Sequence, residues 1–444
     1  MKIHLNDNNV GQNGTCVYSR NDVAALFPIA GKTVSQLCDE NENLLIFPYS
    51  LNETNDCISE SFIFNIQNTD DPNKVVITTG NIMGFIGTQG LQIKIKSRFD
   101  EGRDDYLLHY MLQKVLSFNL FNLKYNNEQE EIFNFAMFMF PSCLQKALRQ
   151  GIYRDYQSYK RNDAKIKGTL DIGRHIKTNI PSNGNISYLT REYSTDNNMT
   201  QLIRHTIEFI KTQKYGLSIL NINHETTENV KTILNHTPSY DKNNRRHIIN
   251  KNLRQKIHPY YIGYHPLRSL CLQILQTEKF KYGDNNDEMS GILFDGAWLW
   301  EEYVNTILCK LGFFHPENRK KKGGIYLFED RSGIRYPDFY KKDIVLDAKY
   351  KRLGSYDNLA KVDRNDIHQI ISYITSLNAN FGGFISPLEY EQTSIPTKKI
   401  KGLSATLSIF GIEISKCASS YESFCKEMMK FEDKFIASLP SPKV

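Results

Sequence analysis

The sequence lacks the features that mark metal-cluster, secreted or membrane proteins. Its eight cysteines are scattered, with no CxxC pair and no His cluster at zinc-ligand spacing, so we expect reduced structural thiols. The N-terminus has no signal-peptide core, and the longest apolar stretch, around 132–144, is too short to cross a bilayer. These absences predict a cytoplasmic protein with no membrane partner.

A complete nucleotide-binding loop is also missing. Gly31-Lys32-Thr33 resembles the end of a P-loop, but Leu26 stands where the first glycine is required and Pro28 lies inside the loop. We therefore expect no GTP or ATP binding through this segment.

Length and pattern predict a multidomain α+β protein. Hydrophobic residues make up 40% of the 444, and the net charge of +6 is only mildly basic, so the whole chain should fold. Residues 1–105 read as short strands separated by Asn, Asp and Gly turns, which predicts a β-rich domain. Residues 106–285 have mainly the 3.6-residue period of packed helices, and residues 286–444 follow the order α-β-β-β-α-β. The polar stretch 281–291 is the expected boundary before this C-terminal α/β domain.

Three residues of the last segment form a candidate chemical centre. If IRYPDFY and DIVLDAKYK pair as a hairpin across the turn Lys341-Lys342, Asp338 lies opposite Val345. Side chains two apart on a strand share a face, so Asp338, Asp347 and Lys349 then project to the same side. A slip of one residue would separate the two aspartates.

Such a cluster suits metal-dependent phosphodiester hydrolysis. Carboxylate oxygens of Asp338 and Asp347 are ligands that Mg²⁺ prefers, and Mn²⁺ could substitute for it. Lys349 is placed to orient or deprotonate an attacking water and to stabilise developing charge. The alternative is that these are polar residues on a solvated strand face.

Neighbouring helices contribute further candidates. Glu301 lies at the edge of the apolar stripe of a helix expected at about 297–311, where it could be a third metal ligand or an ordinary surface glutamate. Gln369 and Tyr373 are four residues apart on a helix expected at 366–377, so they share a face. They are candidates to support Lys349 or contact DNA, and simple packing is the alternative.

The charge near this centre favours a nucleic acid. Between residues 319 and 364 there are thirteen Lys and Arg against seven Asp and Glu, beginning with the run Arg319–Lys322. A phosphate backbone would favour such a surface, although basic runs are more often solvated loops.

Residues 337–349, taken with Glu301 and the pair Gln369 and Tyr373, resemble the centre shared by RecB-like and restriction-type PD-(D/E)xK nucleases. Upstream, MGFIGTQGLQIKIKSRFD, KIKGTLDIGRHI and REYSTDNNMTQLIRHTIEFI resemble McrC, the nuclease subunit of McrBC-type modified-DNA restriction systems. The resemblance spans roughly residues 77–373. It departs at Lys96-Ser97-Arg98, where many McrC chains have a Pro-Lys pair.

The McrC resemblance implies a Mg²⁺-dependent endonuclease that cuts modified foreign double-stranded DNA in phage defence. It implies a partner, a hexameric AAA+ GTPase of McrB type, which this chain binds through residues 1–105 and stimulates; Lys94, Lys96 and Arg98 are candidate contacts. It further implies that Asp338, Asp347 and Glu301 hold the metal, that Lys349 acts on the water, and that Gln369 and Tyr373 support it. The alternatives are a stand-alone RecB-like repair or recombination nuclease and a non-catalytic adaptor of an AAA+ ring.

Overall fold

The computed structural model divides the described chain into two compact units. Unit 1 combines residues 1–126 with residues 285–444, and unit 2 comprises residues 127–284. None of the described helices is both long and apolar enough to cross a membrane. The described residues are 2–10, 17–41, 44–48, 57–88, 91–100, 105–116, 128–213, 216–253, 257–282, 290–316, 322–353, 359–392, 394–416 and 418–440.

Unit 1 contains a mixed five-stranded sheet with the order β1-β7-β6-β11-β3. Its strands are β1 (Lys2–Asn6), β3 (Leu44–Phe47), β6 (Ile82–Thr88), β7 (Leu91–Lys96) and β11 (Ser290–Asp295). A smaller antiparallel sheet consists of β2 (Val17–Ser19), β5 (Lys74–Thr79) and β4 (Phe64–Asn68). Apolar side chains of both sheets share one buried cluster, so the described part of residues 2–96 forms a β-rich region, as the alternating pattern predicts.

Strand β11 changes the expected domain division. It pairs in parallel with β3 and antiparallel with β6, although about 240 residues separate it from β3 and about 200 from β6. The two backbones approach closely at Gly84, whose φ is +131° and whose Cβ, if present, would lie 2.3 Å from the carbonyl oxygen of Ile292. The prediction of three consecutive domains, with a boundary inside residues 281–291, is therefore wrong. Unit 2 is instead an insertion into unit 1.

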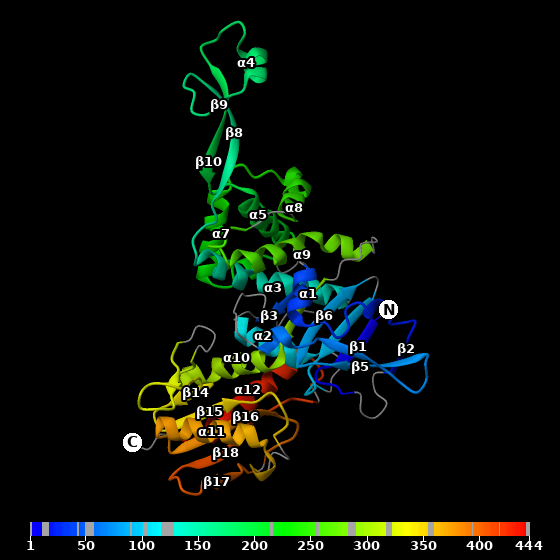
Figure 1. The fold of residues 1–444 in the computed structure, drawn as a ribbon, viewed down its shortest axis with the longest axis vertical. Coiled ribbons are helices and arrows are strands. Elements are labelled where there is room, and N and C mark those ends of the chain that lie inside the picture. The colour runs from blue at the N-terminus through cyan, green and yellow to red at the C-terminus, as the bar shows by residue number, and fades with distance from the viewer. Residues whose placement is uncertain are drawn as a thin grey trace. The chain divides into compact units, whose positions relative to one another are not determined.

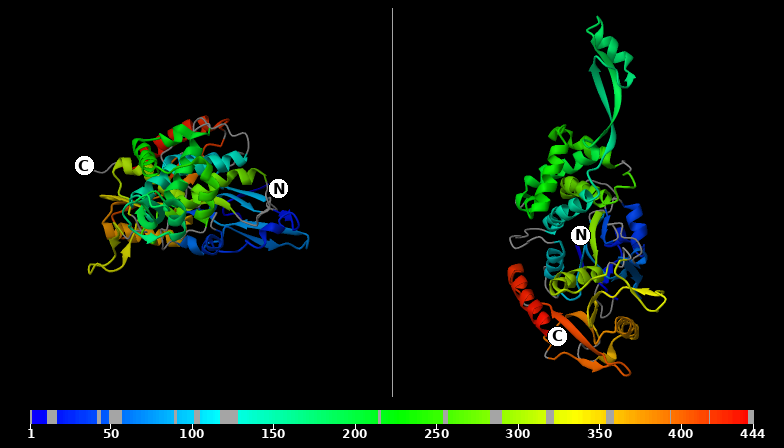
Figure 2. Two further views of the ribbon diagram at one scale, coloured as in Figure 1. Left: turned by 90° about the horizontal axis from the view of Figure 1, so that it is seen from above. Right: turned by 90° about the vertical axis from the view of Figure 1, so that its left-hand side faces the viewer.

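The C-terminal part of unit 1 is an α/β sandwich around a second five-stranded sheet, ordered β14-β15-β16-β18-β17. Its strands are β14 (Phe339–Lys341), β15 (Ile344–Ala348), β16 (Phe381–Leu388), β17 (Thr397–Lys399) and β18 (Thr406–Glu413). Helices α11 (Arg364–Leu377) and α12 (Tyr421–Ser438) cover opposite faces of this sheet (Figure 2). The expected order α-β-β-β-α-β is wrong in its number of strands, because the single strand expected for IRYPDFY is divided in two. Its first part, β13 (Ile334–Arg335), pairs with β12 (Ile325–Tyr326) in a separate hairpin, and its second part is β14.

Helix α10 (Gly296–Leu308) joins the two sheets, because it begins directly after β11. Asp295 caps it by accepting a hydrogen bond from the backbone N–H of Ala297 at 2.8 Å. The apolar stripe predicted from the sequence is buried: Leu299, Trp300, Tyr303, Val304, Ile307 and Leu308. Helix α2 (Tyr106–Leu116) packs on α10, with the rings of Tyr110 and Tyr303 5.9 Å apart.

Unit 2 is a helical body from which a β-ribbon projects (Figure 1). The ribbon is formed by β8 (Asp155–Asp163) and β10 (Ile186–Ser194), and its tip carries β9 (Thr169–Leu170) and α4 (Ile172–Asn179). The body contains α3 (Glu128–Leu148), α5 (Asn198–Lys211), α6 (Gly216–Leu220), α7 (His224–His236), α8 (Arg245–Leu253) and α9 (Tyr264–Tyr282). The helical period expected for most of this region is thus confirmed.

The segment that resembles a P-loop is a helix start. Thr33 is the N-cap of α1 (Val34–Glu40), and it exchanges hydrogen bonds with Gln36 in a capping box. Lys32 pairs with Glu40 at 2.6 Å. The polar side chains of this segment therefore stabilise the start of α1.

The described cysteines Cys143, Cys271 and Cys425 are buried free thiols, as expected.

Candidate active site

The hairpin β14–β15 carries the predicted centre in a register that differs from the expected one. Tyr340 pairs with Val345 and Lys341 with Ile344, so the turn is Lys342-Asp343 and the expected turn Lys341-Lys342 is wrong. The left-handed φ of +42° at Lys342 accommodates this tight connection. The shift amounts to two residues in the pairing, which leaves every side chain on its predicted face. Continuing the register places Asp338 directly opposite Asp347.

Asp347 is a buried carboxylate in the middle of the C-terminal sheet. Asp347 is 1% exposed, and its neighbours Val345 and Leu346, which lie on opposite faces of β15, are fully buried. A solvated strand face is therefore excluded for Asp347. Oδ1 accepts no hydrogen bond from any described residue. A buried carboxylate oxygen without a partner is costly unless a cation or water completes it.

Lys349 supplies the charge next to this carboxylate. Its Nζ lies 2.7 Å from Oδ2 of Asp347 and 3.7 Å from Oδ1 of Asp366, which lies in the first turn of α11. The backbone N–H of Lys349 donates to the carbonyl of Ile385 on β16, so the sheet fixes the position of its Cα. The expected proximity of Asp347 and Lys349 is confirmed, and Asp366 is an addition that the sequence pattern did not reveal.

Asp338 is held against the same strand. Its Oδ2 accepts a hydrogen bond from the backbone N–H of Ala348 at 2.7 Å, and its carbonyl oxygen lies 2.7 Å from Nδ1 of His315. The other ring nitrogen of His315 lies 3.8 Å from Oε1 of Glu301 on α10. The structure thus brings Glu301 to the same site, through a histidine that sequence analysis missed because a single His carries no spacing signal.

Gln369 and Tyr373 lie on the face of α11 that meets Lys349. The ammonium of Lys349 donates to Oε1 of Gln369 at 3.1 Å, and Nε2 of Gln369 donates to the hydroxyl of Tyr373 at 2.8 Å. The Tyr373 hydroxyl in turn donates to the carbonyl of Tyr336 at 3.3 Å. This chain of contacts fixes the amide orientation of Gln369, so the side chain presents its oxygen to the lysine.

Burial and mutual repulsion dominate the electrostatics of the site. Burial raises the pKa of Asp338 well above its usual value, and the charges of Asp347 and Glu301 raise it further. Burial also raises the pKa of Asp347, against the opposing effect of Lys349. Burial alone would lower the pKa of Lys349, but Asp347 and Asp338 outweigh it and raise the pKa. Because burial makes the charged forms of both carboxylates costly, the site favours a bound cation between them.

The donor set fits Mg²⁺ better than a transition metal. Within the part of the chain that the structure describes, no three His, Cys, Asp or Glu side chains converge as a ready-made cage. Mg²⁺ does not need one, because it usually binds through one or two carboxylates together with waters and substrate phosphates. Asp338 and Asp347, with Glu301 beyond them, supply such oxygens.

The basic run Arg319–Lys322, which the charge pattern of the sequence connects with nucleic-acid binding, lies outside the described residues except for Lys322.

The fold and this site define a two-unit α+β protein whose C-terminal sheet carries a buried acid and lysine cluster. A family model described as "McrBC 5-methylcytosine restriction system component" matches residues 77–387, which is more than half of the chain. The chain therefore belongs to the McrBC family.

Other comparisons are more distant. No curated protein matches the sequence. Among solved structures, a half-complex of Thermococcus gammatolerans McrB AAA+ hexamers with bound McrC is similar over 97% of this chain and 100% of that chain, at 13% identity and a TM-score of 0.47. A second structure, the McrBC complex of the same organism, is 14% identical, covers 70% of this chain and 88% of that chain, and has a TM-score of 0.28.

Proposed function

We propose that this chain is the DNA-cleaving subunit, of McrC type, of a McrBC-like restriction complex. The observation that carries the proposal is the cluster of Asp338, Asp347 and Lys349, with Oδ1 of Asp347 lacking a hydrogen bond from the described residues. Glu301, whose side chain is 35% exposed, lies next to this cluster beside His315. Membership of the McrBC family supports the same class of substrate. The reaction is hydrolysis of a phosphodiester bond in modified double-stranded DNA.

The residues divide the work according to their chemistry. Asp338 and Asp347 would hold a Mg²⁺ ion, with Glu301 as a further oxygen donor, and the ion would supply a more acidic attacking water and neutralise phosphate charge. Lys349 orients the water and stabilises charge that develops on the phosphoryl oxygens. Gln369 keeps the Lys349 ammonium directed to the site, and Tyr373 orients Gln369.

We further propose that the partner is an AAA+ GTPase of McrB type that this chain stimulates. The half-complex of Thermococcus gammatolerans described above contains McrB AAA+ hexamers with bound McrC, and this chain carries no complete P-loop of its own. Two of the three expected contact residues are unsuited to that role. Lys94 is buried at 6% exposure, and Arg98 is engaged with Asp7 and Tyr350, so Lys96 alone remains a candidate.

Cleavage by the assembled system tests the proposal. The full chain is combined with the AAA+ GTPase encoded in the same host, and methylated and unmethylated plasmids are followed with Mg²⁺ and GTP. We expect cleavage of methylated DNA, and Asp347→Asn should reduce its rate at least a hundredfold because it replaces a charged carboxylate ligand with a neutral amide. Asp343→Asn, in the turn of the same hairpin, is the matched control and should retain activity.

The alternatives give different outcomes in this assay. Robust cutting by the chain alone, without GTP and without the partner, would favour a stand-alone repair or recombination nuclease. GTPase stimulation without any cutting would favour a non-catalytic adaptor. Equal cleavage by wild type and Asp347→Asn would refute the assignment of the site.

A further inference from the structure

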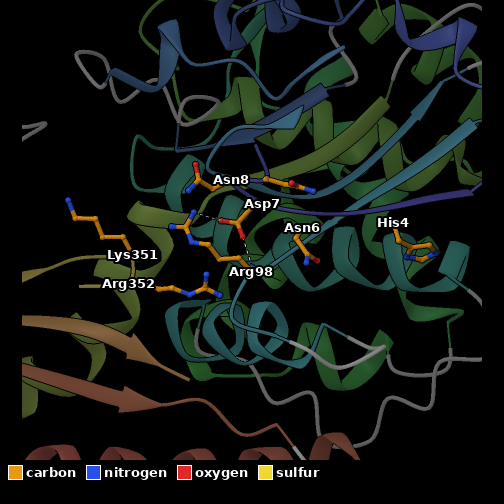
Figure 3. A pocket seen from close by; sticks show the side chains of 8 residues that line it. His4, Asn6, Asp7, Asn8, Arg98, Lys351 and Arg352 are labelled. Atoms are coloured by element: carbon orange, nitrogen blue, oxygen red, sulfur yellow. Dashed lines mark hydrogen bonds and ion pairs between the residues drawn. The ribbon is translucent and has the colours of Figure 1, made fainter. Parts of the chain in front are cut away.

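A polar pocket lies in unit 1 between the end of β1 and the segment that follows β15. Its volume is about 530 Å³, within the range of roughly 300–1,000 Å³ typical of ligand pockets. All of its lining side chains are polar or charged, and they include His4, Asn6, Asp7, Arg98, Lys351 and Arg352 (Figure 3). Most small-molecule pockets are predominantly apolar, so this lining suits a charged and strongly hydrated ligand.

Arg98 forms a fixed cationic floor. Its Nη1 lies 3.5 Å from Oδ2 of Asp7, its backbone N–H donates to Oδ1 of Asp7 at 2.5 Å, and its Nη2 donates to the carbonyl of Tyr350. The side chain is 13% exposed, and among the described residues Nη1 has no acceptor with hydrogen-bond geometry. Because Nη1 is itself buried, Arg98 contributes its positive charge to the floor of the pocket and not a direct contact through this atom.

Lys351 and Arg352 form an accessible cationic rim. Their side chains are 44% and 58% exposed, and each is oriented by a carboxylate that is not part of the lining. Nζ of Lys351 lies 2.5 Å from Oδ2 of Asp366, and the guanidinium of Arg352 engages Glu389 through Nε and Nη2. These carboxylates hold the cations at the pocket edge. In Figure 3, Asp7 and Arg98 lie between this rim and His4.

The lining is positively charged overall. Asp7 is its one carboxylate, against the cations of Arg98, Lys351 and Arg352. Burial raises the pKa of Asp7 to about 6, although Arg98 lowers it, so the carboxylate is partly neutralised just below neutral pH. A phosphate at the rim would compete with Asp366 and Glu389 for the two exposed cations.

The pocket also lies next to the candidate active site. Lys351 and Arg352 follow Lys349 by two and three residues, and three residues of extended chain span at most about 10 Å. Lys349 and Lys351 contact the two oxygens of the same carboxylate, Asp366. Since one DNA strand carries a phosphate for every ~3.4 Å of helix rise, 10 Å corresponds to about three phosphates.

We propose that this pocket binds a backbone phosphate of the DNA strand being cut, within about three nucleotides of the scissile bond. The proposal rests on the DNA-cleaving function proposed above and adds a binding site to it. The pocket reads no base sequence, because its cations contact phosphate, and it aligns the strand across Asp347 and Lys349.

Salt-dependent binding of a short duplex to the full chain, with Ca²⁺ in place of Mg²⁺ to prevent cutting, tests the proposal. We expect Arg352→Gln to weaken binding about two- to fivefold, as for one exposed ion pair, irrespective of DNA sequence. The slope of log K against log [salt] should fall in magnitude by about 1, and Arg352→Lys should retain most of it. Lys426→Gln is the control, because Lys426 is 64% exposed, pairs with Glu422 and lies outside the pocket.

Cleavage kinetics with Mg²⁺ add a second readout. Arg352→Gln should raise KM while kcat stays within about twofold of wild type, because the phosphate contact exists in both ground and transition states. A salt slope and KM equal to those of Lys426→Gln, in a protein whose wild type binds and cuts DNA, would overturn the pocket proposal alone. A wild type that neither binds nor cuts DNA, with or without the GTPase, would overturn the proposed function.

A calorimetric titration with inorganic phosphate separates free anions from DNA. If inorganic phosphate competes weakly with the duplex for the wild-type protein, and this competition is lost in Arg352→Gln, the result supports a backbone phosphate as the occupant of the pocket. Phosphate binding that Arg352→Gln abolishes while the DNA salt slope is unchanged would assign the pocket to a free anion and overturn the proposal.

Discussion

Glu432 on α12 joins the N-terminal and C-terminal segments of unit 1, and its removal tests whether they fold together. Its Oε1 accepts hydrogen bonds from the hydroxyls of Tyr110 on α2, at 2.7 Å, and Tyr303 on α10, at 2.8 Å. Its Oε2 pairs with Lys114 at 2.8 Å. Burial raises the pKa of both tyrosines, with Glu432 adding to the effect, so both remain protonated donors.

The cost of Glu432→Ala follows from these three contacts. Each buried hydroxyl left without an acceptor costs about 1–3 kcal/mol, and the quarter-exposed Lys114 adds at most about 1 kcal/mol. We therefore expect a loss of about 3–5 kcal/mol, a large part of the 5–15 kcal/mol that usually separates folded from unfolded states. Glu432→Gln keeps an acceptor for the hydroxyls and should lose less than half as much.

Urea denaturation followed by tryptophan fluorescence measures this loss. The sequence has two tryptophans, Trp298 and Trp300, and both lie on α10, where the ring of Trp300 is 5.5 Å from that of Tyr303, so the signal reports unit 1. Glu422→Ala is the control on the same helix, because Glu422 is 60% exposed and its removal should change the free energy of unfolding by less than about 0.5 kcal/mol. A loss below about 1 kcal/mol for Glu432→Ala would refute the claim that the buried contacts join these segments.

Two further substitutions separate chemistry from stability. Lys349→Ala should abolish cleavage without loss of Mg²⁺ binding, since the amine acts on the water; a collapse of Mg²⁺ affinity in calorimetry would contradict this division of roles. Burial, reinforced by the charge of Asp100, raises the pKa of Asp105 from 3.8 to about 7. The folded state therefore binds this proton more tightly than the unfolded state does. The stabilisation that the protonated group provides is lost as the pH rises from about 4 to 7. Asp105→Asn, at a φ of +37° that Asn tolerates, should therefore stabilise the protein at pH 8 by on the order of 2 kcal/mol and flatten that pH dependence; equal denaturation midpoints at pH 8 would argue against it.

Local periodicity explains which parts of the fold could be predicted. Helices α10 and α11 are predicted within a few residues of their observed bounds, because apolar side chains at helical spacing mark each of them. The face shared by Asp347 and Lys349 follows from the two-residue period of a strand. The expected hairpin register is wrong by two residues because the turn depends on the left-handed conformation of Lys342, which sequence type does not predict for lysine.

Tertiary partners explain what could not be predicted. His315 and Asp366 join the site as single polar residues with no spacing signal, and an acidic residue in the first turn of a helix is ordinarily explained by the helix dipole. Strand β11 is a short apolar run next to a polar stretch, and nothing in it indicates that its neighbours β3 and β6 lie about 240 and about 200 residues upstream. Long-range strand pairing of this kind leaves no local pattern.

The pairing of β11 also changes how partner docking has to be tested. On the sequence alone, deletion of residues 1–103 should leave a folded nuclease domain, but in the structure it removes β3 and β6 and uncovers Ile292, Leu293 and Phe294, which are at most 1% exposed. At about 1.5–3 kcal/mol for each side chain, this exposure alone approaches the whole stability of a typical domain. The deletion also removes Ser97 and its 2.7 Å contact with the hydroxyl of Tyr350, the residue after Lys349. Loss of GTPase stimulation in such a truncation would therefore report unfolding around the active site as much as loss of a docking surface, and substitution of surface residues such as Lys96 in the intact chain distinguishes the two.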